Sequence, residues 1–135
     1  MATPYSKIYN SFLGKITDYD LPSLSAEFKD LFMLGLLTSA IPKFKVCIED
    51  LSDRSDTILE FTDDLSDESV DILSELMVVE WLQPQLYKSD FFQNQLGTKD
   101  FSLFSPAYLL KEVRQTYFLA KQNAKNMMVN YSYYN

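Results

Sequence analysis

The stretch from residue 65 to residue 86 reads LSDESVDILSELMVVEWLQPQL, and it decides the fold class. Ser66 followed by two acids is typical of a helix start, because its hydroxyl caps free amides and the helix dipole favours nearby acids. Leu65 and Val70 occupy the two positions of a hydrophobic staple. Apolar residues then cover most of the circumference, which is typical of a buried central helix. Pro84 predicts that this helix ends just before it.

Further helices are predicted on both sides of this stretch. Apolar residues at helical spacing indicate helices over Pro4–Ile16, Ala26–Ile41 and Ser89–Leu96. A last helix of about twenty residues is expected to begin at Ser105-Pro106. Thr3 is expected to cap the first helix. Pro42 ends the second helix or bends it into a continuation over residues 43–48.

The expected core follows from the same spacing. In the second helix, the predicted inner face holds six residues, namely Phe28, Leu31, Phe32, Leu36, Leu37 and Ala40. Across the whole chain, we expect the core to include Phe12, Phe32, Leu73, Leu76, Trp81 and Val113.

Length and composition predict one all-α domain that spans residues 1–135. The chain is 47% hydrophobic, and its 3 glycines and 5 prolines argue against a turn-rich β fold. The pattern indicates a small bundle of four to five helices with a buried central helix and a long C-terminal helix. Residues 57–61 are β-prone, and they fit a strand of a short hairpin as well as an extended connector.

The residue inventory argues against an enzyme. The chain has no histidine, so it lacks the usual general base near neutral pH and the commonest metal ligand. Its single cysteine, Cys47, is expected to be a buried, inert thiol. The acids do not follow the spacing of a calcium loop, and no phosphate-binding loop or nucleophile–base set is present. We expect no catalytic residue, no metal and no cofactor. No signal peptide or membrane span is evident.

The charge is distributed unevenly along the chain. The net charge is −7, but residues 49–75 alone contain eleven acids and one base, Arg54. From residue 106 onward, four bases accompany one acid. Such asymmetry favours head-to-tail contacts between copies, or a basic end that meets an acidic partner. The simpler interpretation is that the acidic loop, residues 49–64, is only a solvated segment.

The C-terminal sequence NYSYYN, residues 130–135, is the best candidate interface among the remaining features. Tyrosine offers a large amphipathic surface with few rotatable bonds, which suits protein interfaces. A tyrosine-rich tail that folds back on its own core is an equally consistent interpretation. Nucleic-acid binding is weakly supported, because the bases of the last helix are too sparse for a DNA-facing stripe.

Three stretches resemble a family of small structural proteins of tailed phages, the head–tail connectors, adaptors or neck proteins. They are TPYSKIYNSFLGKITDYDL at residues 3–21, DLSDESVDILSELMVVEWLQPQL at residues 64–86, and LGTKDFSLFSPAYLLKEVR at residues 96–114. The resemblance implies a ring of about twelve copies beneath the portal protein that extends the DNA channel. It also implies that the end of the C-terminal helix reaches the portal. The middle of this chain is more acidic than the family pattern.

The resulting hypothesis is a virion protein of the phage neck, made in the host cytoplasm, with no catalytic role. Its partners would be the portal, other neck or tail-completion proteins, further copies of itself, and DNA that passes without sequence specificity. The residues expected to bind the portal are Lys121, Lys125, Tyr131, Tyr133 and Tyr134. Those expected to face the channel or a neighbouring copy are Asp50, Asp53, Arg54, Asp56, Asp63 and Asp64. The alternative is a phage inhibitor whose acidic segment mimics DNA and binds a host DNA-binding protein.

Overall fold

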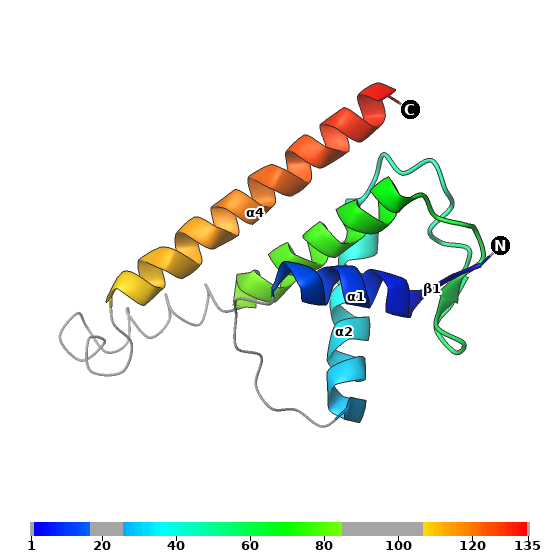
Figure 1. Cartoon of the computed structure of the whole chain (residues 1–135), viewed down its shortest axis with the longest axis horizontal. Helices are drawn as coiled ribbons and strands as arrows, with labels where there is room; N and C mark the ends of the chain where they lie inside the picture. Colours follow the sequence, from blue (N-terminus) through cyan, green and yellow to red (C-terminus); the bar gives the residue numbers. More distant parts are fainter. Residues whose placement is uncertain (1, 17–25, 85–106, 135) are drawn as a thin grey trace.

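The computed structural model describes residues 2–16, 26–84 and 107–134, and the side chains of residues 26–29 and 107–113 lie outside that description (Figure 1). The described residues form four α-helices and a small antiparallel sheet, which confirms the predicted mostly helical fold. Three predicted features fall outside the described residues. They are the helix over Ser89–Leu96, the helix start at Ser105-Pro106 and the core position of the Val113 side chain.

The central helix, residues 67–84, is buried on most of its faces, as predicted. The Ser66 hydroxyl accepts a hydrogen bond from the Ser69 amide at 3.1 Å, so the predicted N-cap is confirmed. Leu65 and Val70, the two staple residues, are both buried. The helix includes Pro84, the last described residue before the gap, so the boundary predicted just before this proline is wrong by at least one residue. Leu73, Leu76 and Trp81 belong to the core as expected.

Helix α1, Tyr5–Lys15, is linked to the central helix by polar and aromatic contacts. Its apolar stripe is buried, and the rings of Phe12 and Trp81 meet edge to face with centroids 6.3 Å apart. At the end of α1, the Lys15 ammonium lies 2.7 Å from Asp71 and 3.2 Å from Glu75. These contacts hold the N-terminal helix along one side of the central helix.

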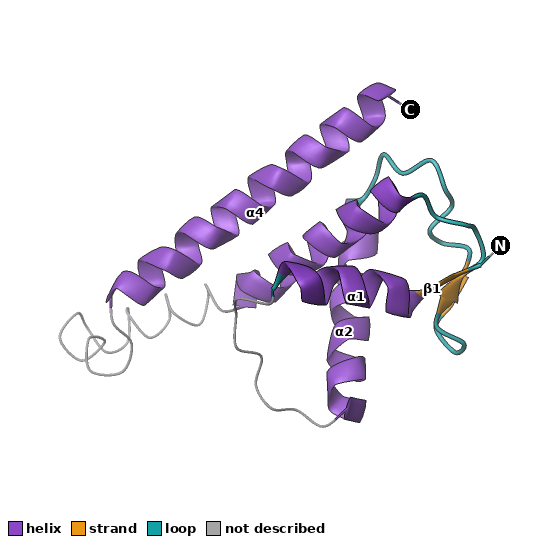
Figure 2. Ribbon diagram, viewed as in Figure 1, coloured by secondary structure: helices purple, strands orange, loops and turns teal. Residues whose placement is uncertain are grey.

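Three two-residue strands form a sheet beside the start of α1 (Figure 2). Strand β3, Glu60–Phe61, pairs antiparallel with β1, Thr3–Pro4, and with β2, Arg54–Ser55. Of the two interpretations of residues 57–61, the structure therefore supports the hairpin. The predicted capping role of Thr3 is wrong. Its hydroxyl donates to the Asp63 carbonyl and accepts from the Leu65 amide, so Thr3 joins the first strand to the start of the central helix.

Helix α2, Ala26–Ala40, passes into a 3-10 turn over Ile41–Lys43 at Pro42. The optional helical continuation over residues 43–48 is wrong, because turns follow Lys43. The predicted inner face is also partly wrong: Leu31 and Phe32 are 68% and 39% exposed. The buried side chains are Met33, Leu36, Leu37 and Ala40. Helix α2 carries apolar residues on nearly all sides, so spacing alone did not identify the face that packs inward.

Helix α4, Ala107–Tyr134, is longer than expected, with 28 residues. It includes the segment predicted as a tyrosine-rich tail, because the helix continues to Tyr134 (Figure 1). Only one stripe of α4 is buried among its described side chains, namely Tyr117, Ala120, Ala124 and Tyr131. Phe118, Leu119 and Val129 stay exposed. The helix therefore rests on the domain along one side and leaves apolar side chains in solvent.

Candidate interaction surfaces

Among the described residues, the structure contains neither a group of side chains that could hold a metal ion nor a helix that could span a membrane. Within residues 2–16, 26–84 and 107–134, no three histidine, cysteine or acidic side chains gather closely enough to hold a metal ion. Among the helices that the structure describes, none is long and apolar enough to cross a membrane. Two surfaces and one partly buried polar cluster are the candidate features among the described residues.

The first surface is a groove between the central helix and α4, which we call the α4 groove. It encloses about 590 Å³, a volume in the range of small binding pockets. Its apolar lining comes from Leu76 and Val79 of the central helix and from Ala124 and Met128 of α4. Phe118 also lines it and is largely exposed.

Three lysines, Lys43, Lys121 and Lys125, surround this groove. Lys43 forms an ion pair with Glu80, so its charge is already compensated. The Lys121 ammonium lies 5.8 Å from the centre of the Tyr117 ring. Neither Lys121 nor Lys125 has an ion-pair partner among the carboxylates that the structure describes. Within the described part of the chain, the groove therefore combines an apolar floor with two lysines that no carboxylate pairs, a combination that suits an acidic, apolar ligand.

The second surface is the acidic hairpin, residues 53–62, whose tip, residues 56–59, connects β2 to β3. At the tip, Ile58 is 67% exposed and Leu59 is 38% exposed. Leu59 has φ 58°, a left-handed conformation that costs a residue other than glycine roughly 1–2 kcal/mol. Its carbonyl accepts the Tyr5 amide at 2.9 Å, which fixes the tip against the first turn of α1. The tip is therefore held in an unfavourable backbone conformation while it presents apolar side chains to solvent.

The residues predicted to face a channel or a neighbouring copy divide into two groups. Four of them are exposed, namely Asp50, Asp53, Asp56 and Asp64. The other two, Arg54 and Asp63, are half-buried. Several of them bond within the chain: Asp53 accepts from Thr62, Asp63 accepts from the Asp50 amide, and Arg54 donates to the Leu51 carbonyl. The acidic loop is consequently a hydrogen-bonded structure.

Asp56 accepts a hydrogen bond of 2.7 Å from the Tyr5 hydroxyl. Burial, followed by this hydrogen bond and the nearby negative charge, raises the pKa of Tyr5 well above its ordinary value. The tyrosine therefore keeps its proton and remains a donor to Asp56, which adds a second link between the hairpin and α1.

A polar cluster around Glu49 joins three segments that are distant in sequence. Its carboxylate accepts hydrogen bonds from the Ser66 amide at 3.0 Å, the Ser69 hydroxyl at 3.1 Å and the Tyr131 hydroxyl at 2.9 Å. The Cys47 thiol also donates to it at 3.3 Å. Glu49 thus accepts a hydrogen bond from the backbone amide of the N-cap residue of the central helix. In a capping box, a glutamate in the first turn of the helix itself accepts this bond.

The protonation states in this cluster follow from its hydrogen bonds. Burial alone would raise the pKa of Glu49, but the bonds from Ser66, Tyr131 and Cys47 outweigh it and hold the pKa at about 2. Burial, together with the neighbouring Glu49 carboxylate, raises the pKa of Cys47 to about 11. The thiol is therefore protonated at neutral pH, which agrees with the expected inert thiol, but Cys47 is half-buried and not buried as predicted.

The residues predicted to bind the portal do not form one patch. Tyr131 is 2% exposed, and its ring packs edge to face against Phe44 at 5.2 Å. It is a core residue, which corrects its assignment to a docking surface. Its position continues the stripe of Tyr117, Ala120 and Ala124, so helical spacing extended past Met127 would have identified it.

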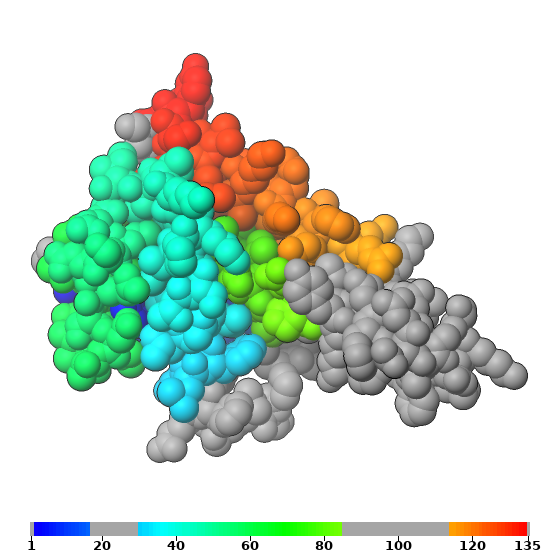
Figure 3. Space-filling view, turned by 180° about the vertical axis from the view of Figure 1, so that it is seen from behind, coloured from blue at the N-terminus to red at the C-terminus, as the bar shows by residue number. Residues whose placement is uncertain are grey.

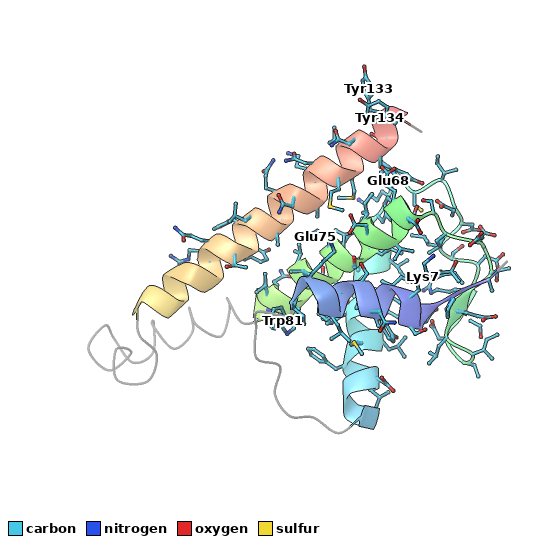
Figure 4. The ribbon with its side chains drawn as sticks, in the orientation of Figure 1. Lys7, Glu68, Glu75, Trp81, Tyr133 and Tyr134 are labelled. Atoms are coloured by element: carbon cyan, nitrogen blue, oxygen red, sulfur yellow. The ribbon has the colours of Figure 1, made fainter. Side chains whose placement is uncertain are left out.

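The other four predicted portal-binding residues are separated along α4. Tyr133 and Tyr134 are largely exposed at its end, with ring centroids 5.1 Å apart (Figure 4). Lys121 and Lys125 lie about 12–18 Å further back along the helix axis and line the α4 groove. The structure therefore provides two separate surfaces on α4, one aromatic and one basic.

Comparison of the chain with family models, curated proteins and solved structures gave no match.

Proposed function

We propose that this protein is a structural component of a phage neck, a head–tail connector that forms a ring beneath the portal and extends the DNA channel. The resemblance of three sequence stretches to that family suggests the role. The observation that carries the proposal is the form of α4, a 28-residue helix that ends in two exposed tyrosines.

The anchoring of α4 makes its end suitable for docking. Tyr131 lies just before the exposed pair and holds the last helical turns against Ile48 and Glu49 through its hydroxyl. Because these turns are already ordered, a partner that contacts Tyr133 and Tyr134 loses less conformational entropy on binding. Exposed tyrosines on a rigid support are frequent centres of binding energy.

The test is native mass spectrometry of the chain with the portal protein encoded in the same genome. We expect the wild-type chain to bind as a stoichiometric ring, and the double substitution Tyr133→Ser and Tyr134→Ser to weaken that binding about tenfold or more. Leu119→Ser serves as the matched control, because it removes an exposed apolar side chain from another part of the same helix.

Two outcomes would overturn the proposal. One is the absence of portal binding under conditions in which the portal itself is intact. The other is tight, salt-sensitive binding to a host DNA-binding protein without incorporation into particles, which would favour the DNA-mimic alternative instead.

A further inference from the structure

We propose that the tip of the acidic hairpin of one copy inserts into the α4 groove of the next copy, so that the copies associate head to tail. This inference deepens the proposed function, because it names the contact that would build the ring. It rests on the match in shape, polarity and charge between two surfaces of the same chain.

The hairpin tip has the properties of a ligand for such a groove. Ile58 and Leu59 project apolar surface, and the carboxylates of Asp56 and Glu60 flank them. Asp56 is paired with Arg54 at 3.7 Å, whereas Glu60 forms no ion pair within the described residues. Hydrogen bonds from Tyr5 to Leu59 and Asp56 fix the tip before it meets a partner. The ordering cost of association is therefore small.

The α4 groove has the complementary properties. Its floor of Leu76, Val79 and Ala124 would receive the apolar tip, and Lys121 and Lys125 at its edge would meet the flanking carboxylates. The two lysines have no described carboxylate partner within their own chain, whereas Lys43 on the same groove is neutralised by Glu80. Among the described residues of one copy, the groove therefore carries two lysine charges that no carboxylate offsets.

The positions of the two surfaces favour contact between copies over contact within one. The hairpin lies at the end of the molecule that carries the N-terminus, whereas α4 begins at the opposite end and carries the groove along its middle, residues 117–128 (Figure 1). In the space-filling view, α4 runs from the side away from the hairpin to the top of the molecule, where its last residues lie next to the teal segment (Figure 3). A contact between two different surfaces of identical chains repeats itself and produces a ring if the rotation closes.

Charge reversal with recovery tests the contact directly. Glu60→Lys and Lys121→Glu should each weaken self-association about tenfold, measured by sedimentation velocity over a range of concentrations with and without portal. The double variant should recover most of the loss, because the exchanged charges again attract across the contact. Lys45→Glu is the control, since it makes the same change at an exposed site outside the groove.

The apolar part of the contact has a closely matched control. Ile58 and Ile48 are 67% and 65% exposed, but only Ile58 lies at the hairpin tip. Ile58→Ser should weaken association about ten- to a hundredfold, whereas Ile48→Ser should leave it unchanged. Equal effects of the two substitutions would overturn the inference.

A cross-link then reports the geometry. In a Cys47→Ser background, one variant carries Thr57→Cys at the tip and another carries Gln122→Cys at the groove. Mild oxidation of the mixture should give a disulfide between one copy of each variant. In the control mixture, the Thr57→Cys variant is replaced by a Ser132→Cys variant, whose cysteine is exposed near the C-terminus. This mixture should form little of the mixed disulfide.

The outcomes separate this inference from the proposed function. Rings on the portal that tolerate all hairpin and groove substitutions would overturn the contact and leave the connector role in place. Self-association through these surfaces without portal binding would support the contact and overturn the connector role. A chain that stays monomeric at every concentration, with portal or without it, would overturn the contact.

Discussion

The central helix and α4 are both long helices, but they are stabilised in different ways. The central helix buries most of its circumference, and its buried side chains belong to the hydrophobic core. Among the described side chains of α4, one stripe is buried, and a polar cluster holds the last turns of the helix in place. The central helix therefore contributes most of its side chains to the core, whereas α4 leaves most of its described side chains in solvent. The predictions below test that division.

The largest effect is expected in the core around the central helix. Trp81→Ala removes a buried ring that packs against Phe12, and we expect a loss of about 3–5 kcal/mol in the free energy of unfolding. Chemical denaturation followed by circular dichroism measures this loss. A denaturation curve equal to the wild type would contradict the central position of residues 67–84.

A smaller effect is expected where α4 is anchored. Tyr131→Phe keeps the ring against Phe44 but removes the hydroxyl that accepts from the Ile48 amide and donates to Glu49. We expect a loss of about 1–3 kcal/mol in unfolding free energy. Faster hydrogen exchange should be confined to the last turns of α4. Uniformly faster exchange, including the central helix, would contradict the division between the two helices.

The same anchor should make stability depend on pH. The pKa of Glu49 is about 2 in the folded protein, below its ordinary value of 4.5, so the folded state favours the charged form. The stabilisation that charged Glu49 adds to the folded state is complete above about pH 5, and it is lost as the pH falls toward about 2. Glu49→Gln should flatten this part of the stability profile. Glu68→Gln, at an exposed glutamate on the central helix, is the control, and equal profiles for both variants would contradict the assignment.

The smallest effect is expected on the exposed side of α4. Leu119→Ser should change the free energy of unfolding by less than about 0.5 kcal/mol, because the side chain lies in solvent. Thermal unfolding of the Leu119→Ser variant measures this change, and the Trp81→Ala variant, unfolded under the same conditions, gives the large effect for comparison. A loss comparable with that of Tyr131→Phe would show that this side of α4 is packed.

Sequence reasoning succeeded where the signal is local and failed where the partner is distant. The Ser66 cap, the start of α2 and the break at Pro42 follow from residues within a few positions of one another. The role of Thr3 was missed because its partners, Asp63 and Leu65, lie 60 and 62 residues away in the sequence.

The acidic segment shows the same limit for the candidate surfaces. Its charge asymmetry was visible in the sequence and suggested contact between copies. The division of its members into exposed carboxylates and internally bonded ones was not visible, and neither was the groove beside Lys121 and Lys125. A groove between two helices depends on how they pack, which pattern alone does not specify.

The sequence by itself determined the helical class, the buried central helix, the long C-terminal helix and the separation of charge, because each depends on periodicity, capping or composition. Only the tertiary structure decided which face of α2 is buried, that Tyr131 belongs to the core, and that Glu49 joins the acidic loop to two helices. These features arise from contacts between residues far apart in the chain, where burial and hydrogen-bond partners are set by packing.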